Sequence, residues 1–317
     1  MRERFHRSRI ERPDQRFDRV ADSAAALIIR SYSSSFWLAS RLLPEGQRRD
    51  IHHIYALVRV ADEIVDAPRA DQQTDDRRRL LDDLAADTDN ALRCGASANP
   101  VVHAFAGTAR RTGIDATLVD PFFASMRTDL DQYIHDEGSL ADYIHGSAEV
   151  IGLMCLRAFL ADSDADDAPA LGAESPYRRS DSRYQELAPA AARLGAGFQK
   201  VNFLRDLGAD HGELGRAYLP GLDPLAPDAL AWHRWLDEVD QDLAAGARAI
   251  PELPERARVA VCTAHDLFAE LSARLRDTPV EVAATRRVRV SGPAKLRIVA
   301  AAIARGGAPR SANGPRR

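Results

Sequence analysis

Two pairs of aspartates are the residues best placed to do chemistry in this chain. Asp62 and Asp66 stand in ALVRVADEIVDA, and Asp206 and Asp210 stand in FQKVNFLRDLGAD. Residues separated by four positions leave the same face of a helix, so each pair presents two carboxylates together. Two such pairs on facing helices would form a cluster of hard oxygen ligands.

The neighbours of each pair indicate where these faces point. At about 100° per residue, Tyr55 and Arg59 share a narrow arc with the first pair, beside the apolar arc of the same helix. A surface helix would place its acids opposite its apolar stripe, so acids on the margin of that stripe favour a polar-lined cavity. The second helix repeats this arrangement with three further polar residues on or beside the acidic arc: Gln199, Asn202 and Arg205.

A divalent cation is the expected partner of these carboxylates. Facing carboxylates repel each other, and each costs several kcal/mol to bury unless it is paired or binds a cation. Only Arg59 and Arg205 lie near them in sequence. Carboxylate and amide oxygens without Cys or His favour Mg²⁺, with Mn²⁺ as the alternative, and the arginines would then be free to bind phosphate oxygens. A single acid pair at this spacing usually belongs to a solvated surface, but two pairs that both border an apolar stripe favour the metal site.

Bulk composition is that of an ordinary globular protein. The chain has 317 residues, of which 45% are hydrophobic and 28% charged, and it can form one large domain or two. A net charge of -4 gives no reason to expect nucleic-acid binding. Three scattered cysteines, without metal-ligand spacing, predict reduced thiols in a cytoplasmic protein. No apolar run reaches the roughly 18 residues of a spanning helix, and the N-terminus lacks a signal-like apolar core, although peripheral membrane contact stays open.

Apolar periodicity predicts an all-α fold. A period near 3.6 recurs along almost the whole chain, and strand-like alternation is hard to find. We therefore expect a single-domain helical bundle around a central cavity. The expected segments are a flexible N-terminal stretch (1–18), the helical domain (19–306) and a disordered tail (307–317). Within the domain, helices are predicted near 19–32, 44–67, 75–94, 98–112, 116–134, 138–161, 183–213, 226–249, 253–277 and 291–305.

Several stretches resemble one enzyme family in both order and spacing, and the match extends over about residues 20–306. The chain resembles the squalene and phytoene synthases, and its motifs are most similar to those of bacterial phytoene synthases of carotenoid pathways. The resemblance implies an isoprenoid-synthase type of bundle. It rests on SYSSSFWLASRLLP (31–44), IYALVRVADEIVD (54–66), YIHGSAEVIGLM (143–154), LGAGFQKVNFLRDLGAD (194–210), GRAYLP (215–220) and RRVRVSGPAKLRIV near the C-terminus.

The resemblance also implies roles for individual residues. The metal ligands would be the four aspartates, Asp62, Asp66, Asp206 and Asp210, together with Asn202. The residues that bind diphosphate would be Ser33, Ser35, Arg59, Arg205, Gln199 and Arg216. Cavity tyrosines with a catalytic role would be Tyr55 and Tyr143, and the aromatic lining would include Phe36 and Phe268. Many relatives carry a Tyr where this chain has Phe268, and a second Asp where it has Glu63, which lies off the acidic arc and is expected to matter little.

The implied activity is that of a prenyltransferase. Two geranylgeranyl diphosphates would condense head to head (1-1′) through a cyclopropyl diphosphate to give phytoene, without NADPH. The alternative is a squalene or dehydrosqualene synthase acting on farnesyl diphosphate, and the choice depends on cavity depth. Small residues on the helices expected to flank the cavity would either leave room for long chains or allow close helix packing: Ala148, Gly152, Gly195 and Ala196. A non-catalytic family member acting in binding or assembly is disfavoured, because all four aspartates are present.

Overall fold

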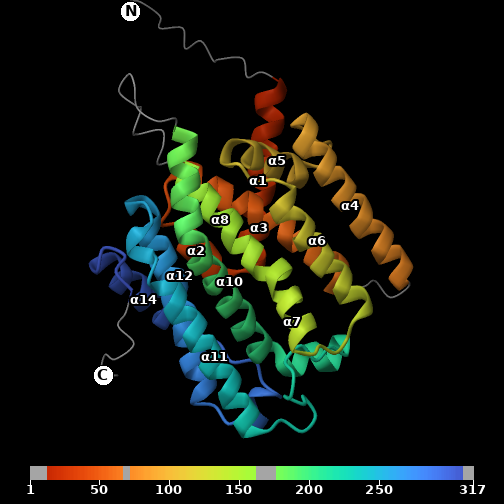
Figure 1. Ribbon diagram of the computed structural model, residues 1–317, viewed down its shortest axis with the longest axis vertical. Helices are drawn as coiled ribbons and strands as arrows, with labels where there is room; N and C mark the ends of the chain where they lie inside the picture. The colour runs from red at the N-terminus through yellow and green to blue at the C-terminus, as the bar shows by residue number, and fades with distance from the viewer. Residues whose placement is uncertain (1–12, 67–71, 162–175, 310–317) are drawn as a thin grey trace, which may run out of the picture.

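A computed structural model describes residues 13–66, 72–161 and 176–309 of the chain, and this part is helical almost throughout (Figure 1). Within those ranges there is no strand, only an isolated bridge between Ile134 and Ala217. The all-α prediction is therefore confirmed. The helices are α1 (Pro13–Tyr32), α2 (Ser34–Ser40), α3 (Glu45–Asp66), α4 (Thr74–Cys94), α5 (Pro100–Thr112), α6 (Ala116–Asp131), α7 (Glu137–Ile144), η1 (His145–Glu149), α8 (Val150–Ala161), α10 (Pro176–Leu214), α11 (Ala229–Ala247), η2 (Ile250–Glu252), α12 (Glu255–Arg276), α13 (Val280–Ala283) and α14 (Gly292–Ala304).

Local sequence accounts for many of the helix boundaries. The side chains of Asp115 and Asp136 accept hydrogen bonds from the first free amides of α6 and α7, which is the usual task of an N-cap residue. Gly95 and Gly113 end α4 and α5 with φ of 83° and 75°. Because side chains rarely tolerate this left-handed conformation, glycine is the residue expected at both positions.

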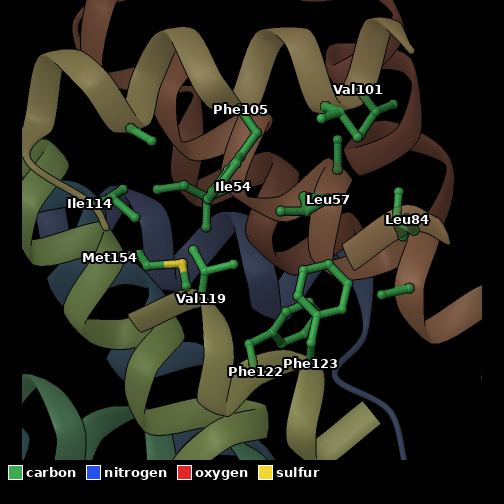
Figure 2. Close-up of a cluster of buried hydrophobic side chains, with 14 of the residues drawn as sticks. Ile54, Leu57, Leu84, Val101, Phe105, Ile114, Val119, Phe122, Phe123 and Met154 are labelled. Carbon is green, nitrogen blue, oxygen red and sulfur yellow. The ribbon is translucent and has the colours of Figure 1, made fainter. Parts of the chain in front are cut away.

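Buried apolar side chains form a large cluster that fixes the orientation of α3. Ile54 and Leu57 of α3 pack with Phe105 of α5, Phe122 of α6 and Met154 of α8, and Figure 2 shows these side chains meeting in one region. With its apolar arc held there, the acidic arc of α3 has to lie along the edge of the cluster. A second cluster is built by α10, α11, α12 and the segment that follows α10.

Helix α10 packs closely against α8, η1 and α11 (Figure 1). A Cβ atom on Gly152 of α8 would lie 2.6 Å from the carbonyl oxygen of Ala191, and one on Gly195 of α10 would lie 2.5 Å from that of Ala148. No side chain fits at these distances, so the two glycines are required for the crossing of α8 and η1 with α10. The structure therefore shows close packing at the two glycines, which also line the cavity described below.

The helix predicted over 138–161 consists of three segments. Its middle segment, η1, is a π-helix in which the amide of Val150 donates to the carbonyl of His145. Gly146 lies against α6, where a Cβ atom would come within 2.1 Å of the carbonyl oxygen of Pro121. The whole stretch Glu137–Ala161 is long and apolar enough to cross a membrane, but 56% of its most apolar window is buried inside the protein, as in a core helix.

The described helices differ from the expected segments at three places. Helix α1 begins at Pro13, so 13–18 are helical and only 1–12 of the expected N-terminal stretch lie outside the described residues. Gly307 is buried and the thiol of Cys262 donates to the carbonyl of Ala308, so the fold continues past the expected start of the tail; 310–317 lie outside the described residues. Helix α2 was not predicted, because its seven residues are too few to show a helical period.

Candidate active site

A cavity of about 1030 Å³ lies inside the bundle, between α2, α3, α8, α10 and α12. Both acid pairs line it, one pair from α3 and one from α10. Leu187, also in its wall, precedes Asp206 by 19 positions on α10, which places the two about 28 Å apart along the helix at 1.5 Å per residue. The cavity therefore has a polar end, at the carboxylates, and a long apolar arm.

The two acid pairs act on each other electrostatically. Burial and the neighbouring Asp66 raise the pKa of Asp62 to about 8. Burial, then Asp206 on the same helix and Asp66 on the opposite one, raise the pKa of Asp210 to about 8. A carboxylate of α3 that acts on a carboxylate of α10 means that the pairs face each other, as the sequence predicted.

Among the residues that the structure describes, one member of each pair has a basic partner within 3 Å. Nη1 of Arg216 lies 2.6 Å from Oδ1 of Asp66, and Nε of Arg287 lies 2.8 Å from Oδ1 of Asp206. The nearest approach of Arg59 to Asp62 is 4.0 Å. Asp62 and Asp210 are therefore the acids whose negative charge is least compensated by the protein, and each is stabilised in its protonated form.

Asn202 supplies a further oxygen ligand that no residue in the described part of the chain uses. It lies one helical turn before Asp206, and its side-chain carbonyl oxygen is buried without a hydrogen-bond partner. Leaving such an atom unpaired costs about 1–3 kcal/mol. A cation would satisfy this oxygen and offset the repulsion between the carboxylates.

The donor set fits a magnesium ion that is shared with a substrate. Over the described part of the chain, no three Asp, Glu, His or Cys side chains converge closely enough to hold an ion by themselves. Mg²⁺ commonly takes only one or two carboxylates and fills its remaining positions with water and phosphate oxygens. The residues that could hold it are those predicted, Asp62, Asp66, Asn202, Asp206 and Asp210, and Mn²⁺ suits the same oxygens.

Positive side chains border the acids. Burial and the nearby Arg205 guanidinium lower the pKa of Arg287 and also that of Lys295. The ammonium of Lys295 donates to the hydroxyl of Ser34 at 2.7 Å, next to Ser33 and Ser35 at the start of α2. Three cations that repel one another beside hydroxyl groups form a site suited to a polyanion such as diphosphate. Arg287 and Lys295 were not singled out from the sequence, although both fall within the matching stretch RRVRVSGPAKLRIV.

Arg59 is held in position by two neighbours. Its guanidinium lies 4.3 Å from the centre of the Tyr32 ring, and its Nε donates to Oε2 of Glu63 at 3.1 Å. Glu63 was expected to matter little because it lies off the acidic arc. The structure instead gives it a role as the acceptor that orients Arg59 at the edge of the cavity.

Arg216 lines the cavity beside Asp66, and both of its terminal nitrogens are bonded to the protein. It is 4% exposed, and besides Asp66 it donates to the carbonyls of Val65 and Asp129 at 3.1 and 3.0 Å. These bonds give Arg216 a positioning role beside Asp66, and the diphosphate contact expected from the sequence stays a prediction. The GRAYLP segment is itself fixed by the amide of Ala217, which donates to the carbonyl of Tyr133 at 2.7 Å.

Asp129 is a site residue that the sequence analysis missed. It accepts hydrogen bonds from the hydroxyls of Tyr143 and Tyr218 at 2.7 and 2.8 Å, and burial raises its pKa to about 6. Tyr143 is thus engaged with Asp129 in the cavity wall. Asp129 is one of three aspartates on α6 and has no other acid three or four positions away, so nothing in its spacing drew attention to it.

Aromatic rings form the next part of the wall. Phe36 lies 6.2 Å from Tyr55 and 5.4 Å from Phe268, measured between ring centres, and Phe268 stacks on Phe198 at 4.0 Å. Burial raises the pKa of Tyr55 to about 12, so this phenol stays neutral. Ser33 hydrogen-bonds Tyr55 and also caps α2 by accepting from the amide of Phe36. The cavity wall also includes Ser35, Gln199 and Arg205.

Comparison with known proteins identifies relatives along most of the chain. A family model described as squalene/phytoene synthase matches residues 29–294. The phytoene synthase of Mycobacterium tuberculosis is 28% identical over 304 residues, which cover 87% of this chain and 88% of that protein. The 15-cis-phytoene synthase of a Paracoccus strain is 26% identical over 282 residues, covering 83% and 84%. Among solved structures, a dehydrosqualene synthase in complex with a ligand superposes with a TM-score of 0.72 at 19% identity, covering 93% of this chain and 99% of the other, a likeness of fold.

Proposed function

Because this chain belongs to the squalene/phytoene synthase family, we propose that it is a prenyltransferase that joins two geranylgeranyl diphosphates head to head and releases phytoene. The observation that carries the proposal is the pair of facing acid clusters, with the unpaired oxygen of Asn202 one helical turn before Asp206 and a basic border beside them. These groups stand at the polar end of a long apolar cavity. A prenyl diphosphate matches this arrangement, because it consists of a long apolar chain with a charged diphosphate at one end.

The polar end would hold the leaving group. Arg205, Arg287 and Lys295 can each donate to diphosphate oxygens, and the planar guanidinium groups can do so in pairs. Bound Mg²⁺ would neutralise negative charge that develops on the diphosphate. When the allylic C–O bond breaks, its electron pair goes to the diphosphate oxygen, so donors already aimed at that position stabilise the transition state more than the ground state.

The aromatic wall would protect the carbocation. The ring faces of Phe36, Tyr55 and Phe268 offer negative electrostatic potential without a strong nucleophile. Tyr55 suits this task because burial raises its pKa to about 12, so it carries no phenolate that could capture the cation. Buried apolar neighbours exclude water, which would otherwise quench the cation to an alcohol.

Condensation then takes two steps within the same cavity. The double bond of the second substrate attacks the first cation, and loss of a proton closes a cyclopropane that still carries one diphosphate. Cleavage of that second C–O bond gives a new cation, which rearranges to the 1-1′ linkage. Loss of a further proton leaves the central double bond, so two diphosphates and two protons are released and no reductant is needed.

The alternative is a squalene or dehydrosqualene synthase that uses C15 farnesyl diphosphate. It is favoured by the likeness in fold to a dehydrosqualene synthase. The C20 substrate is favoured by the names of relatives that align over most of the chain, and by the apolar arm that extends about 28 Å along α10 beyond Asp206.

Product analysis tests the proposal. Purified protein with Mg²⁺ is supplied with C15 or C20 diphosphate, with and without NADPH, and the hydrocarbons are identified by mass. We expect a C40 product from C20 diphosphate that does not depend on NADPH. A C30 hydrocarbon formed much faster from C15, or a strict need for NADPH, would move the assignment to the alternative. An Asp206→Asn variant serves as the inactive control.

A further inference from the structure

A second hollow lies on the outer surface, at the junction of α10, α11 and η2. It measures about 890 Å³ and its rim carries three arginines, Arg183, Arg193 and Arg248. This groove lies near the start of α10, whereas the acid pair of α10 lies near its end. It is therefore distinct from the polar end of the catalytic cavity.

Three residues line both this groove and the catalytic cavity: Leu187, Ala190 and Ala249. On the inner side, the cavity continues over Ile250 and Leu253. A residue that borders both hollows makes a wall one side chain thick. At this place the apolar arm of the cavity comes closest to the groove.

The packing of α10 against α11 explains why the wall is thin. One helical turn inward, the two helices touch so closely that a Cβ atom on Gly246 would lie 2.7 Å from Cβ of Leu194. Helix α11 then ends at Ala247 and the chain turns into η2. Beyond that point the small side chains of Ala190 and Ala249, together with that of Leu187, which is 6% exposed, line both hollows.

The chemistry of the proposed reaction requires a route for an apolar molecule. Substrate arrives with a diphosphate that the polar end can bind, but the product carries no charge. At the polar end it would have to pass the carboxylates, the arginines and the diphosphates just released. We propose that the hydrocarbon product leaves through the wall formed by Leu187, Ala190 and Ala249, with Leu187 moving aside, and enters the groove. This inference rests on the proposed function, and its occupant is an uncharged polyprenyl hydrocarbon.

Enlarging the two alanines tests the route. Ala190→Trp and Ala249→Trp should block the seam, so in each variant steady-state turnover should fall about fivefold or more below the rate of its own first turnover, giving a burst of about one product per enzyme. The product should then stay with the protein through gel filtration. Ala245→Trp is the matched control, because Ala245 lines the groove but not the cavity, and it should behave as wild type.

Two results would overturn the route. One is a parallel loss of first-turnover and steady-state rates in the blocked variants, which would make the wall an ordinary part of the catalytic cavity. The other is steady-state turnover at the wild-type level. If a tryptophan variant does not fold, Leu187→Ala provides the test. Product release should be faster in Leu187→Ala than in the wild type, and an unchanged release rate counts against the route. A wild-type protein that forms no hydrocarbon even in a single turnover would instead refute the proposed function.

Discussion

The carbonyl oxygen of Ala284 lies directly over Gly208 of α10, where a Cβ atom would come within 1.8 Å of it. This contact places the segment after α13 against the acidic helix, and three residues further on Arg287 reaches Asp206. The missing side chain of Gly208 therefore helps to assemble the basic border of the site. Gly212, four residues later on the same helix, has no atom within 4 Å of its missing Cβ position.

We expect Gly208→Ala to impair the enzyme and Gly212→Ala to leave it unchanged. The added methyl group must displace the backbone of Ala284, and with it Arg287, because neither backbone can yield as a flexible side chain would. A loss of about tenfold in kcat/KM corresponds to about 1.4 kcal/mol of transition-state stabilisation. Steady-state kinetics of the two variants decides the matter, and equal rates would show that the contact has no part in the site.

Asp62→Asn and Asp206→Asn should each abolish turnover. Loss of one ligand should cost several kcal/mol of transition-state stabilisation, while the fold should persist because both side chains face the cavity. Asp120→Asn, on the exposed surface of α6, is the control. Activity and melting temperature are to be measured together. Normal turnover in either site variant, or in wild-type protein with excess chelator, would contradict the metal assignment.

The planar head of Arg59 should matter more than its charge. Arg59→Lys keeps the charge but loses the fork that bonds Glu63 and can bind a diphosphate. Its activity should fall well below that of Arg79→Lys, a change at a side chain that is 74% exposed. Initial rates at saturating and limiting substrate compare the two. Equal rates would reduce Arg59 to an ion-pair partner of the acids.

Magnesium binding should release protons near neutral pH. Burial and like charges raise the pKa of Asp62 and of Asp210 to about 8 in the metal-free protein, so both carboxyls hold protons through much of the range below pH 8. A cation must displace those protons, so the affinity for Mg²⁺ should increase as pH rises from 6 to 8. Calorimetry in buffers with different ionisation enthalpies measures the protons released. A heat of binding independent of the buffer at pH 7 would contradict these assignments.

The same shifts set the pH dependence of metal-free stability. A carboxyl whose pKa is higher in the folded than in the unfolded state holds more protons when folded, between the unfolded value near 4 and the folded value near 8. The contribution of Asp62 and Asp210 to the free energy of unfolding should therefore decline as pH rises through that window. An Asp62→Asn variant without metal should show a weaker decline, which denaturant titrations at several pH values can measure.

Sequence periodicity was enough to predict most helices and the faces that carry the acids. Residues such as Asp62 and Asp66 share one arc whatever the tertiary fold, so their common direction needed no structure. Asp129 and Arg287 could not be found in this way, because each reaches the site by tertiary packing. Arg287 depends on the contact between Gly208 and Ala284, which joins positions 76 residues apart.

The roles of the glycines were the hardest to predict from the sequence. Gly152 and Gly195 suggested either room for a prenyl chain or close packing, and the structure shows that both glycines pack closely against Ala191 and Ala148 and also line the cavity. The surroundings of Arg216 were equally hard to predict from the sequence. An arginine beside an acidic helix suggests a phosphate ligand, but its burial among carbonyls became evident only from the fold.

The π-helix η1 also constrains how the chain can vary in length. Its hydrogen bonds span one residue more than those of an α-helix, so it accommodates an additional residue while the helical faces on either side keep their register. Removing one residue from His145–Glu149 would therefore restore a regular α-helix and leave those faces in place. The loss of Ile151 from α8 would instead turn the following residues by about 100°, and Gly152 and Cys155 would leave the cavity wall. Variation in length by one residue is thus expected to be better tolerated at η1 than within the α-helices on either side of it.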